Sequence, residues 1–256
     1  EPRFLIAQRG SGEVVFYPLV LDCCNWKDGW SRVLCPVGSN EFDFHDPIVA
    51  RPDAFNAMDA FWDCLCDAPH RQVGHDLLTI PRVRSPQSSR DNRFTLSDVA
   101  QVICLSHVEN LEDLMACIPK NTRQEVHRKQ RQLSALGDVQ LRVVKSGDPG
   151  LDRSVDQFLA AHSRRWPAAY RAPGFHARLV RYGIDAGVVL FSVLEVGGQP
   201  VSWRLGLAQE GRSNYYSYMT AYDQSCAQQG PGTVHLVKLI EWAIHKGIRE
   251  FHLLRG

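Results

Sequence analysis

The stretch QQGPGTVHLVKLIEWAIHKGIREFHLL, residues 228–254, decides the fold. Its glycines and proline at 230–232 form a turn, and the turn opens a helix over 233–246. The apolar residues of this helix recur at i, i+3, i+4 and i+7: Leu236, Leu239, Ile240 and Ala243. A strand then covers 248–254. Because the chain has to cross over through the helix, we expect this strand to be a parallel neighbour of the strand that precedes the turn, at 213–222.

The residues just before the turn predict an antiparallel meander. Three runs with strand composition, 188–196, 200–209 and 213–222, are joined by Gly197-Gly198 and Glu210-Gly211, which are typical of tight hairpins. Together with the last strand they make a mixed, mostly antiparallel sheet.

The rest of the chain alternates strands and helices, so we predict an α/β protein, and its 256 residues fit one large domain or two small ones. Asn121 is expected to cap the helix that begins at 122. The other expected strands are 3–9, 13–22, 31–36, 76–80, 99–105 and 139–144. The expected helices are 53–67, 110–118, 122–136, 151–166 and 175–186.

Composition excludes several classes of protein. The 256 residues include 29 Lys and Arg against 28 Asp and Glu, a formal net charge of +1, so a strongly basic nucleic-acid coat is excluded. With 44% hydrophobic and 22% charged residues, the chain is typical of a globular protein, and no apolar run is long enough for a membrane helix. Most of the eight cysteines lie in apolar stretches, which favours free thiols in a reducing cytoplasm and no metal. Motifs of serine hydrolases, P-loop enzymes and zinc proteases are missing.

The turn at Gly230, Gly232 and Thr233 is the strongest candidate site. The first amides of a helix have no partner within the helix, and the helix dipole adds positive partial charge there. Glycines allow close approach of the backbone, so the turn can hold a phosphate or pyrophosphate. The alternative is an ordinary tight turn. His235, in the first turn of the helix, would contact the anion or face solvent.

The order of these features resembles the acyl-CoA N-acyltransferase (GNAT) superfamily, in particular its CelD-like branch, associated with cellulose and polysaccharide biosynthesis and related to Fem-type transferases. The segments that carry the resemblance lie between Asn121 and Gly256. They are Arg123-x4-Arg128, Phe158…His162…Arg165-Trp166, Gly198-Gln199-Pro200-Val201, Tyr216-x-Tyr218-x2-Ala221-x-Asp223, Pro231-Gly232-Thr233, Ala243…Lys246-Gly247 and Phe251-His252-Leu253-Leu254-Arg255-Gly256. In the N-terminal half, Tyr17-Pro18-Leu19 and Asp43-Phe44-His45-Asp46-Pro47 are similar. The resemblance implies two GNAT-like halves, 1–108 and 109–256, each a mixed, mostly antiparallel sheet flanked by helices. Relatives usually continue past Gly256, so we expect this chain to be a fragment that is truncated at both ends.

The resemblance implies direct acyl transfer from acetyl-CoA or another acyl-CoA to an amine. The diphosphate would rest on Gln228, Gly230, Gly232 and Thr233, and the pantetheine arm would follow the edge of strand 213–222. Asp223 is the candidate base, with turn capping as its alternative. Tyr218 is the candidate acid that reprotonates the thiolate. Tyr216, on the same face of the strand, is expected to contact the substrate, and core packing is the alternative for both.

Substrate contacts are expected from the basic helix and from an exposed ring. Arg123 and Arg128 would bind an anionic substrate, or lie on a solvated helix face. Trp166 would offer a stacking surface, or pack against the sheet.

Three functions follow from the resemblance. The first is an acyl-CoA-dependent N-acyltransferase, located in the cytoplasm, that acts on a small polar amine, an amino sugar or an amino acid. The second is a Fem-type transferase that uses aminoacyl-tRNA. The third is a binding module of polysaccharide assembly that has kept the fold without the chemistry. Ala227, which stands where the superfamily usually has Arg or Gln, favours the third.

Overall fold

The computed structural model describes residues 1–9, 13–26, 29–39, 44–50, 61–63, 65–66, 73–83, 100–167, 173–208 and 211–254. The chain divides into two compact units, Glu1–Val99 and Ala100–Gly256, and each is described by itself. The first unit ends nine residues before the predicted 108, and the strand Gln101–Cys104 pairs within the second sheet. The parts of the predicted helix 53–67 at 53–60, 64 and 67 lie outside the described residues.

The first unit is built on a mixed sheet in the order β1-β2-β3-β5, and β4 also pairs with β2. Among the described strands of this sheet, only β3 and β5 pair in parallel. Residues 61–63 and 65–66 are helical and bury Phe61, Trp62 and Leu65 against this sheet. The strands are β1 (Pro2–Arg9), β2 (Glu13–Trp26), β3 (Gly29–Pro36), β4 (Ile48–Ala50) and β5 (Leu77–Leu78).

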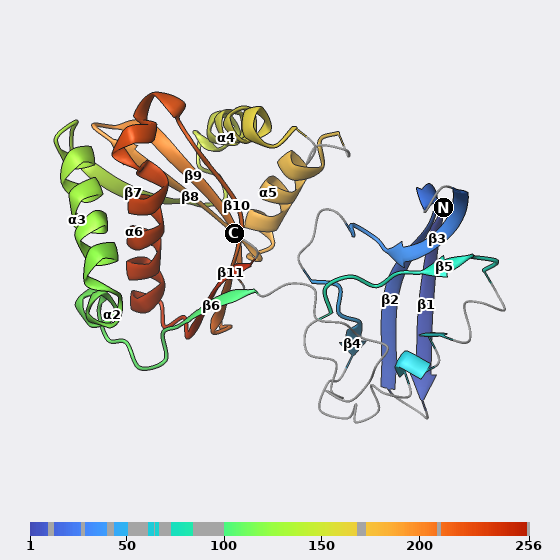
Figure 1. Ribbon diagram of the computed structural model, residues 1–256. Helices are drawn as coiled ribbons and strands as arrows, with labels where there is room; N and C mark the ends of the chain where they lie inside the picture. Colours follow the sequence, from blue (N-terminus) through green and yellow to red (C-terminus); the bar gives the residue numbers. More distant parts are fainter. Residues whose placement is uncertain are drawn as a thin grey trace. The chain divides into compact units, whose positions relative to one another are not determined.

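The second unit is built on a sheet in the order β6-β11-β10-β9-β8-β7 (Figure 1). Its strands are β6 (Gln101–Cys104), β7 (Val139–Val144), β8 (Val189–Val196), β9 (Gln199–Ala208), β10 (Asn214–Tyr222) and β11 (Glu250–Leu254). Its helices are α2 (Leu111–Cys117), α3 (Lys120–Ser134), α4 (Leu151–Arg165), α5 (Phe175–Asp185), the 3-10 helix η3 (Gln224–Gln229) and α6 (Pro231–His245). The predicted meander is confirmed, and β10 and β11 are parallel neighbours. Two mixed, mostly antiparallel sheets flanked by helices confirm the predicted fold class.

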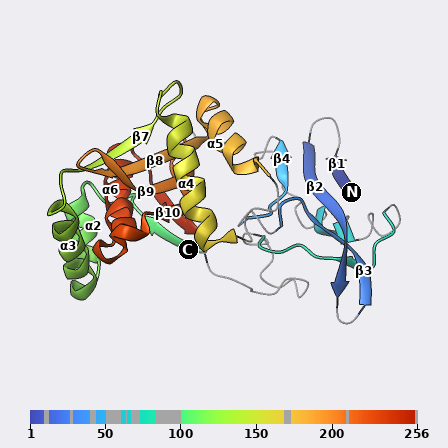
Figure 2. The same cartoon turned by 90° about the horizontal axis from the view of Figure 1, so that it is seen from above.

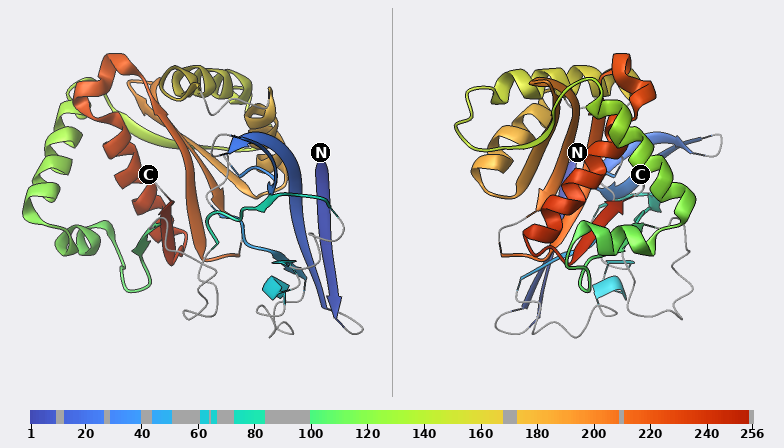
Figure 3. Two further views of the ribbon diagram at one scale, coloured as in Figure 1. Left: turned by 45° about the vertical axis from the view of Figure 1, so that its right-hand side comes forward. Right: turned by 90° about the vertical axis from the view of Figure 1, so that its left-hand side faces the viewer.

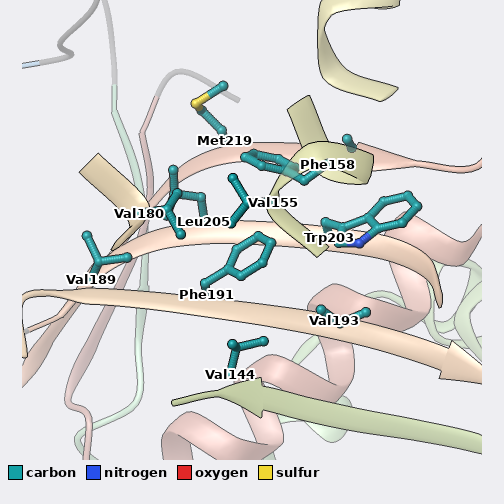
Figure 4. Close-up of a cluster of buried hydrophobic side chains, with 11 residues drawn as sticks. Val144, Val155, Phe158, Val180, Val189, Phe191, Val193, Trp203, Leu205 and Met219 are labelled. Atoms are coloured by element: carbon teal, nitrogen blue, oxygen red, sulfur yellow. The ribbon is translucent and has the colours of Figure 1, made fainter. Parts of the chain in front are cut away.

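Helices cover both faces of the second sheet (Figure 2). On one face α4 and α5 bury a core around Phe158, Val180, Phe191 and Leu205 (Figure 4). On the other face α6 packs on Tyr215 and Phe251, and α3 lies beside α6 (Figure 3). None of the described helices is long and apolar enough to cross a membrane.

Two helix starts differ from the prediction. Helix α3 begins at Lys120 after Pro119, so Asn121 lies inside the first turn and is not the cap. Helix α6 begins at Pro231, two residues earlier than expected, because proline is well suited to the first helical position. Gly230 caps it in the left-handed conformation, with φ 64°. Gly232 and Thr233 therefore belong to the helix itself.

Candidate active site

The two parallel strands diverge beside the α6 turn. β10 pairs with β11 only from Asn214 to Tyr216, which face Glu250 to His252. Beyond Tyr216, β10 continues to Tyr222 with β9 as its only strand partner among the described residues. The edge of β10 from Ser217 onward thus carries backbone groups that no described strand occupies, as at the open edge of a sheet.

A bulge in β10 places Tyr218 at the start of this unpaired edge. Ser217 pairs with Gly206 and Met219 pairs with the next residue, Leu205, so Tyr218 is the extra residue of the bulge. The ring of Tyr218 packs beside the core under α4 and α5. Its hydroxyl oxygen lies 3.3 Å from Nε2 of His176 on α5.

Tyr216 packs on the neighbouring strand. Its ring stacks on His252 with centroids 4.4 Å apart, and its hydroxyl accepts a hydrogen bond from Asn214 at 3.4 Å. Its predicted contact with substrate stays a prediction.

Asp223 caps the short helix that follows β10. Its carboxylate accepts a hydrogen bond from the amide of Ser225 at 2.9 Å, and the side chain is exposed. Turn capping is the alternative role that the sequence allowed for Asp223. The role of Asp223 as a base stays a prediction. Gln228 lies exposed in the same 3-10 helix.

The α6 turn has fewer unpaired amides than the sequence implied. The amide of Gly230 donates a hydrogen bond to the carbonyl of Ala227, and the amide of Thr233 donates to the carbonyl of Gly230 at 3.0 Å. Pro231 has no amide hydrogen. In the described part of the chain, Gly232 is the residue of 230–233 whose amide makes no backbone hydrogen bond. Backbone donors alone are therefore too few for a diphosphate.

Lys129 supplies positive charge at this turn. A Cβ placed on Gly230 would lie 2.5 Å from Nζ of Lys129, so the ammonium group lies directly over the turn. The side chain of Lys129 is only 20% exposed, and its Nζ is 3.6 Å from a carboxylate oxygen of Glu125. A cation at a helix N-terminus is opposed by the helix dipole, and a bound anion would relieve that repulsion.

Arg204 adds a second cation beneath the same turn. It is buried on β9, and its guanidinium donates to the Ser217 hydroxyl at 3.2 Å and to the Gly232 carbonyl at 3.1 Å. Burial lowers the pKa of Arg204. None of the ion pairs among the described residues includes Arg204. A buried charge without a counter-ion is costly, so this end of α6 favours an anionic ligand.

An aromatic and cationic stack stands next to Gly232. The guanidinium carbon of Arg165 lies 5.3 Å from the Trp166 ring centroid and 5.9 Å from that of Tyr222. Trp166 is half exposed, and a Cβ on Gly232 would lie 3.6 Å from the Tyr222 ring. The Arg165 guanidinium thus lies near both rings, and the stacking of a substrate on Trp166 stays a prediction.

Arg123 and Arg128 are both engaged within the protein. Arg123 donates to the Met115 carbonyl at 3.1 Å, and thereby ties α3 to α2. Arg128 forms a bidentate pair with Glu125, at 2.6 and 2.7 Å. Their predicted contact with substrate stays a prediction, and Lys129 is the residue of this helix that the structure brings to the α6 turn.

His235 differs from both of its expected roles. It is fully buried between α6 and the sheet, where its two ring nitrogens lie 2.9 Å and 3.0 Å from the hydroxyls of Ser192 and Ser202. Burial first, and then the charge of Arg204, hold the pKa of His235 well below its usual value. It therefore neither contacts a ligand nor faces solvent, because it sits on the inner side of the helix.

The residues that sequence reasoning missed are Lys129, Arg204, His176 and Tyr222. Arg204 carried a signal, because it is a charge in the centre of the otherwise apolar strand QPVSWRLGLA. His176 carried no such signal, because its position opposite Tyr218 depends on the packing of α5 on the sheet.

Comparisons with known proteins agree with this fold. A family model described as an acetyltransferase (GNAT) domain matches residues 120–256, from the first residue of α3 to the end. No curated protein matches the sequence.

Solved structures share the fold over both units. One is the C-terminal domain of a protein described as a lysylphosphatidylglycerol synthetase from Agrobacterium fabrum, 12% identical, TM-score 0.59, covering 99% of this chain and 70% of that one. Another is L-PGS from Bacillus licheniformis, 14% identical, TM-score 0.61, covering 98% and 67%. A third is FemX, 9% identical, TM-score 0.58, covering 100% and 79%.

Proposed function

The chain belongs to the family of acetyltransferase (GNAT) domains and is an N-acyltransferase, and from this premise we propose that acyl-CoA is its donor. The acceptor in this proposal is the amine of a small polar molecule, an amino sugar or an amino acid. The observation that carries the proposal is the convergence of Lys129, Arg204 and the N-terminus of α6 beside the unpaired edge of β10.

The diphosphate of the donor would lie at this convergence. The amide of Gly232 donates one hydrogen bond, the Lys129 ammonium neutralises charge over Gly230, and Arg204 adds positive potential from below. Thr233 would offer its hydroxyl, and Gln228 its exposed amide. Basic residues outnumber acidic residues in 100–256, whereas acidic residues outnumber basic residues in 1–99, so the positive potential belongs to the unit that holds the site.

The adenine of the donor would stack on the exposed ring of Trp166. The guanidinium of Arg165 lies near that ring and near the ring of Tyr222, and Tyr222 lies close to Gly232. Stacking of a base on an aromatic ring contributes about 1–3 kcal/mol.

The acyl group would then follow β10 toward its bulge. There the amine attacks the thioester carbon, and unpaired amides of the β10 edge stabilise the oxyanion. Tyr218, at the bulge, exchanges protons with the amine and the leaving thiolate. Asp223 is the alternative base, at the end of the same strand.

A second candidate donor is aminoacyl-tRNA. It is supported by the likeness to FemX and to the two synthetase structures, which extends over both units and not over the GNAT domain alone. The tRNA ends in an adenosine, so the stack at Trp166 suits this donor equally, and Arg123 and Arg128 lie on the helix that also carries Lys129. Polysaccharide biosynthesis and the cytoplasm are the setting that we propose for either donor.

The direct test measures the release of the carrier, CoA or tRNA, from the group that is transferred. The full chain is incubated with acetyl-CoA and a panel of amino sugars and amino acids, and free thiol is measured. We expect amine-dependent thiol release. If thiol is not released but an aminoacyl-tRNA is deacylated in the presence of an amine, the second donor is correct.

Thermal unfolding separates these enzymes from a binding module. A ligand that binds only the folded state at 100 times its Kd raises stability by about 2.7 kcal/mol. Stabilisation by CoA without transfer to any amine would favour the binding module. Binding of tRNA that weakens steeply with salt would favour the second donor.

A further inference from the structure

A pair of buried histidines lies behind the Tyr218 hydroxyl. His176, on the first turn of α5, is 4% exposed, and His162, on the last turn of α4, is 7% exposed. The ring of His176 stacks on that of Tyr218 with centroids 6.1 Å apart and planes inclined by 30°. The hydroxyl and Nε2 of His176 are at hydrogen-bonding distance, 3.3 Å.

We propose that His176 is a proton relay for Tyr218 in the acyl-transfer reaction. This inference rests on the proposed function, and deepens it by naming the group that makes the Tyr218 hydroxyl usable as a base. An ordinary tyrosine has a pKa near 10, so its hydroxyl accepts an amine proton only if its own proton has somewhere to go. The bulge brings Tyr218 to the unpaired edge of β10, and the packing of α5 brings an imidazole to its far side.

The protons balance through one cycle. As the amine nitrogen bonds to the acyl carbon, its proton passes to the Tyr218 oxygen, and the Tyr218 proton moves to Nε2 of His176. The bond from carbon to the carrier then breaks, and the departing sulfur or oxygen takes a proton from Tyr218. His176 returns its proton to Tyr218, and both groups end neutral. This requires the His176 tautomer that carries its hydrogen on Nδ1.

The surroundings keep His176 in the form that can accept a proton. Burial lowers the pKa of His176 below its ordinary 6.5. Among the described residues of α4, the titratable groups near it are His162, whose pKa is lowered to about 4 by burial first and then by His176 and Arg165, and Arg165 itself. From β10 the group is Tyr218. The neighbouring strand β8 presents apolar side chains to this face, such as Phe191.

The pH dependence of turnover follows from this. Below the pKa of His176, which burial places under 6.5, the imidazole is already protonated and cannot accept, so kcat/KM falls at acid pH. His176→Gln keeps a polar side chain of similar reach, but cannot take up a proton. We expect this variant to lose about 100-fold in kcat, with little change in KM, and to lose the acid limb of the pH profile.

Two further variants make the test specific. Tyr218→Phe removes a single oxygen from a half-buried ring, and we expect the same loss; adding His176→Gln to it should cost little more, because both act in one relay. His162→Gln removes the neighbouring buried imidazole and should retain the acid limb. Tyr218→Phe also serves if His176→Gln does not fold.

The outcomes distinguish a failure of the relay from a failure of the proposed function. If the wild-type chain transfers acyl groups and the pH profile of His176→Gln matches that of the wild type, the relay is wrong and the proposed function stands. If His162→Gln loses the acid limb and His176→Gln keeps it, the relay is also wrong. A wild-type chain that releases neither thiol nor tRNA overturns the proposed function, and the relay with it.

Discussion

Lys129 and Arg128 are adjacent on α3, but their charges have different surroundings. The Arg128 guanidinium is held by both oxygens of Glu125 on the outer face of the helix, whereas the Lys129 ammonium lies over Gly230. Lys129 and Arg128 contribute equally to the net charge of the chain. Only Lys129 is placed to contact a phosphate at the α6 turn.

We therefore expect Lys129→Gln to weaken binding of the donor about tenfold, the equivalent of a charge-assisted hydrogen bond of about 1.4 kcal/mol. The measurement is calorimetric titration of acetyl-CoA at low salt. Arg128→Gln is the matched control, with the same charge change one residue away, and should bind as the wild type does. Equal weakening in both variants would mean that the general field of α3 acts, and not a contact at the turn.

At the scale of elements, α6 is fixed to the sheet by a polar chain as well as by apolar packing. His235 bridges Ser192 on β8 and Ser202 on β9, and the Ser202 hydroxyl donates to the Ala221 carbonyl on β10 at 3.1 Å. A neutral imidazole can donate at one nitrogen and accept at the other, and so can satisfy both hydroxyls. This link holds the α6 turn in register with three strands.

The same link predicts a loss of stability in acid. The pKa of His235 is well below 6.5 in the folded chain, and His162 and His176 are also lowered, so between the folded and unfolded pKa values the unfolded chain binds more protons. The free energy of unfolding is therefore at its full value above about pH 7 and falls as the pH drops through 6.5. Denaturant unfolding at pH 7.5 and pH 5.5 measures the change.

His235→Gln identifies the contribution of this residue. We expect it to lower stability at pH 7.5 by about 1–3 kcal/mol, because one serine loses its partner, and to reduce the difference between the two pH values. A variant with an undiminished difference would assign the acid sensitivity to other groups. His245→Gln, at the last residue of α6, is the control and should change neither value much.

The strand pattern of the second unit was readable from sequence, but the details of its site were not. Alternation and hairpin glycines predicted the meander, and the length of the crossover predicted that β10 and β11 are parallel. The bulge at Tyr218 has no local signal, because it depends on the pairing register with β9. The start of α6 was misplaced because the turn glycine at 232 was taken to be outside the helix.

For a related reason, the sequence did not indicate Lys129 and His176 as residues of the site. Sequence spacing shows which residues share a helix face, but does not show which helix lies beside that face. The contact between α3 and α6 brings Lys129 to the turn, and the packing of α5 brings His176 to Tyr218. Both contacts join residues far apart in the chain.

At the scale of the whole molecule, the two units differ in charge and in their similarity to known families. The family model covers 120–256, within the second unit, whereas the likeness to solved structures extends over both. The donor site that we propose lies wholly in the second unit.

One measurement tests the central claim, that the α6 turn holds the phosphates of the donor. Acetyl-CoA and an aminoacyl-tRNA are each titrated into the full chain, into Gly232→Trp and into Gly232→Ala. The space at Gly232 accepts a methyl group at 3.6 Å from Tyr222, and its backbone is not left-handed, so Gly232→Ala is the folded control. We predict that one donor binds the wild type and Gly232→Ala, and binds Gly232→Trp at least tenfold more weakly. Equal affinity for Gly232→Trp, or no binding of either donor to the wild type, would contradict the account.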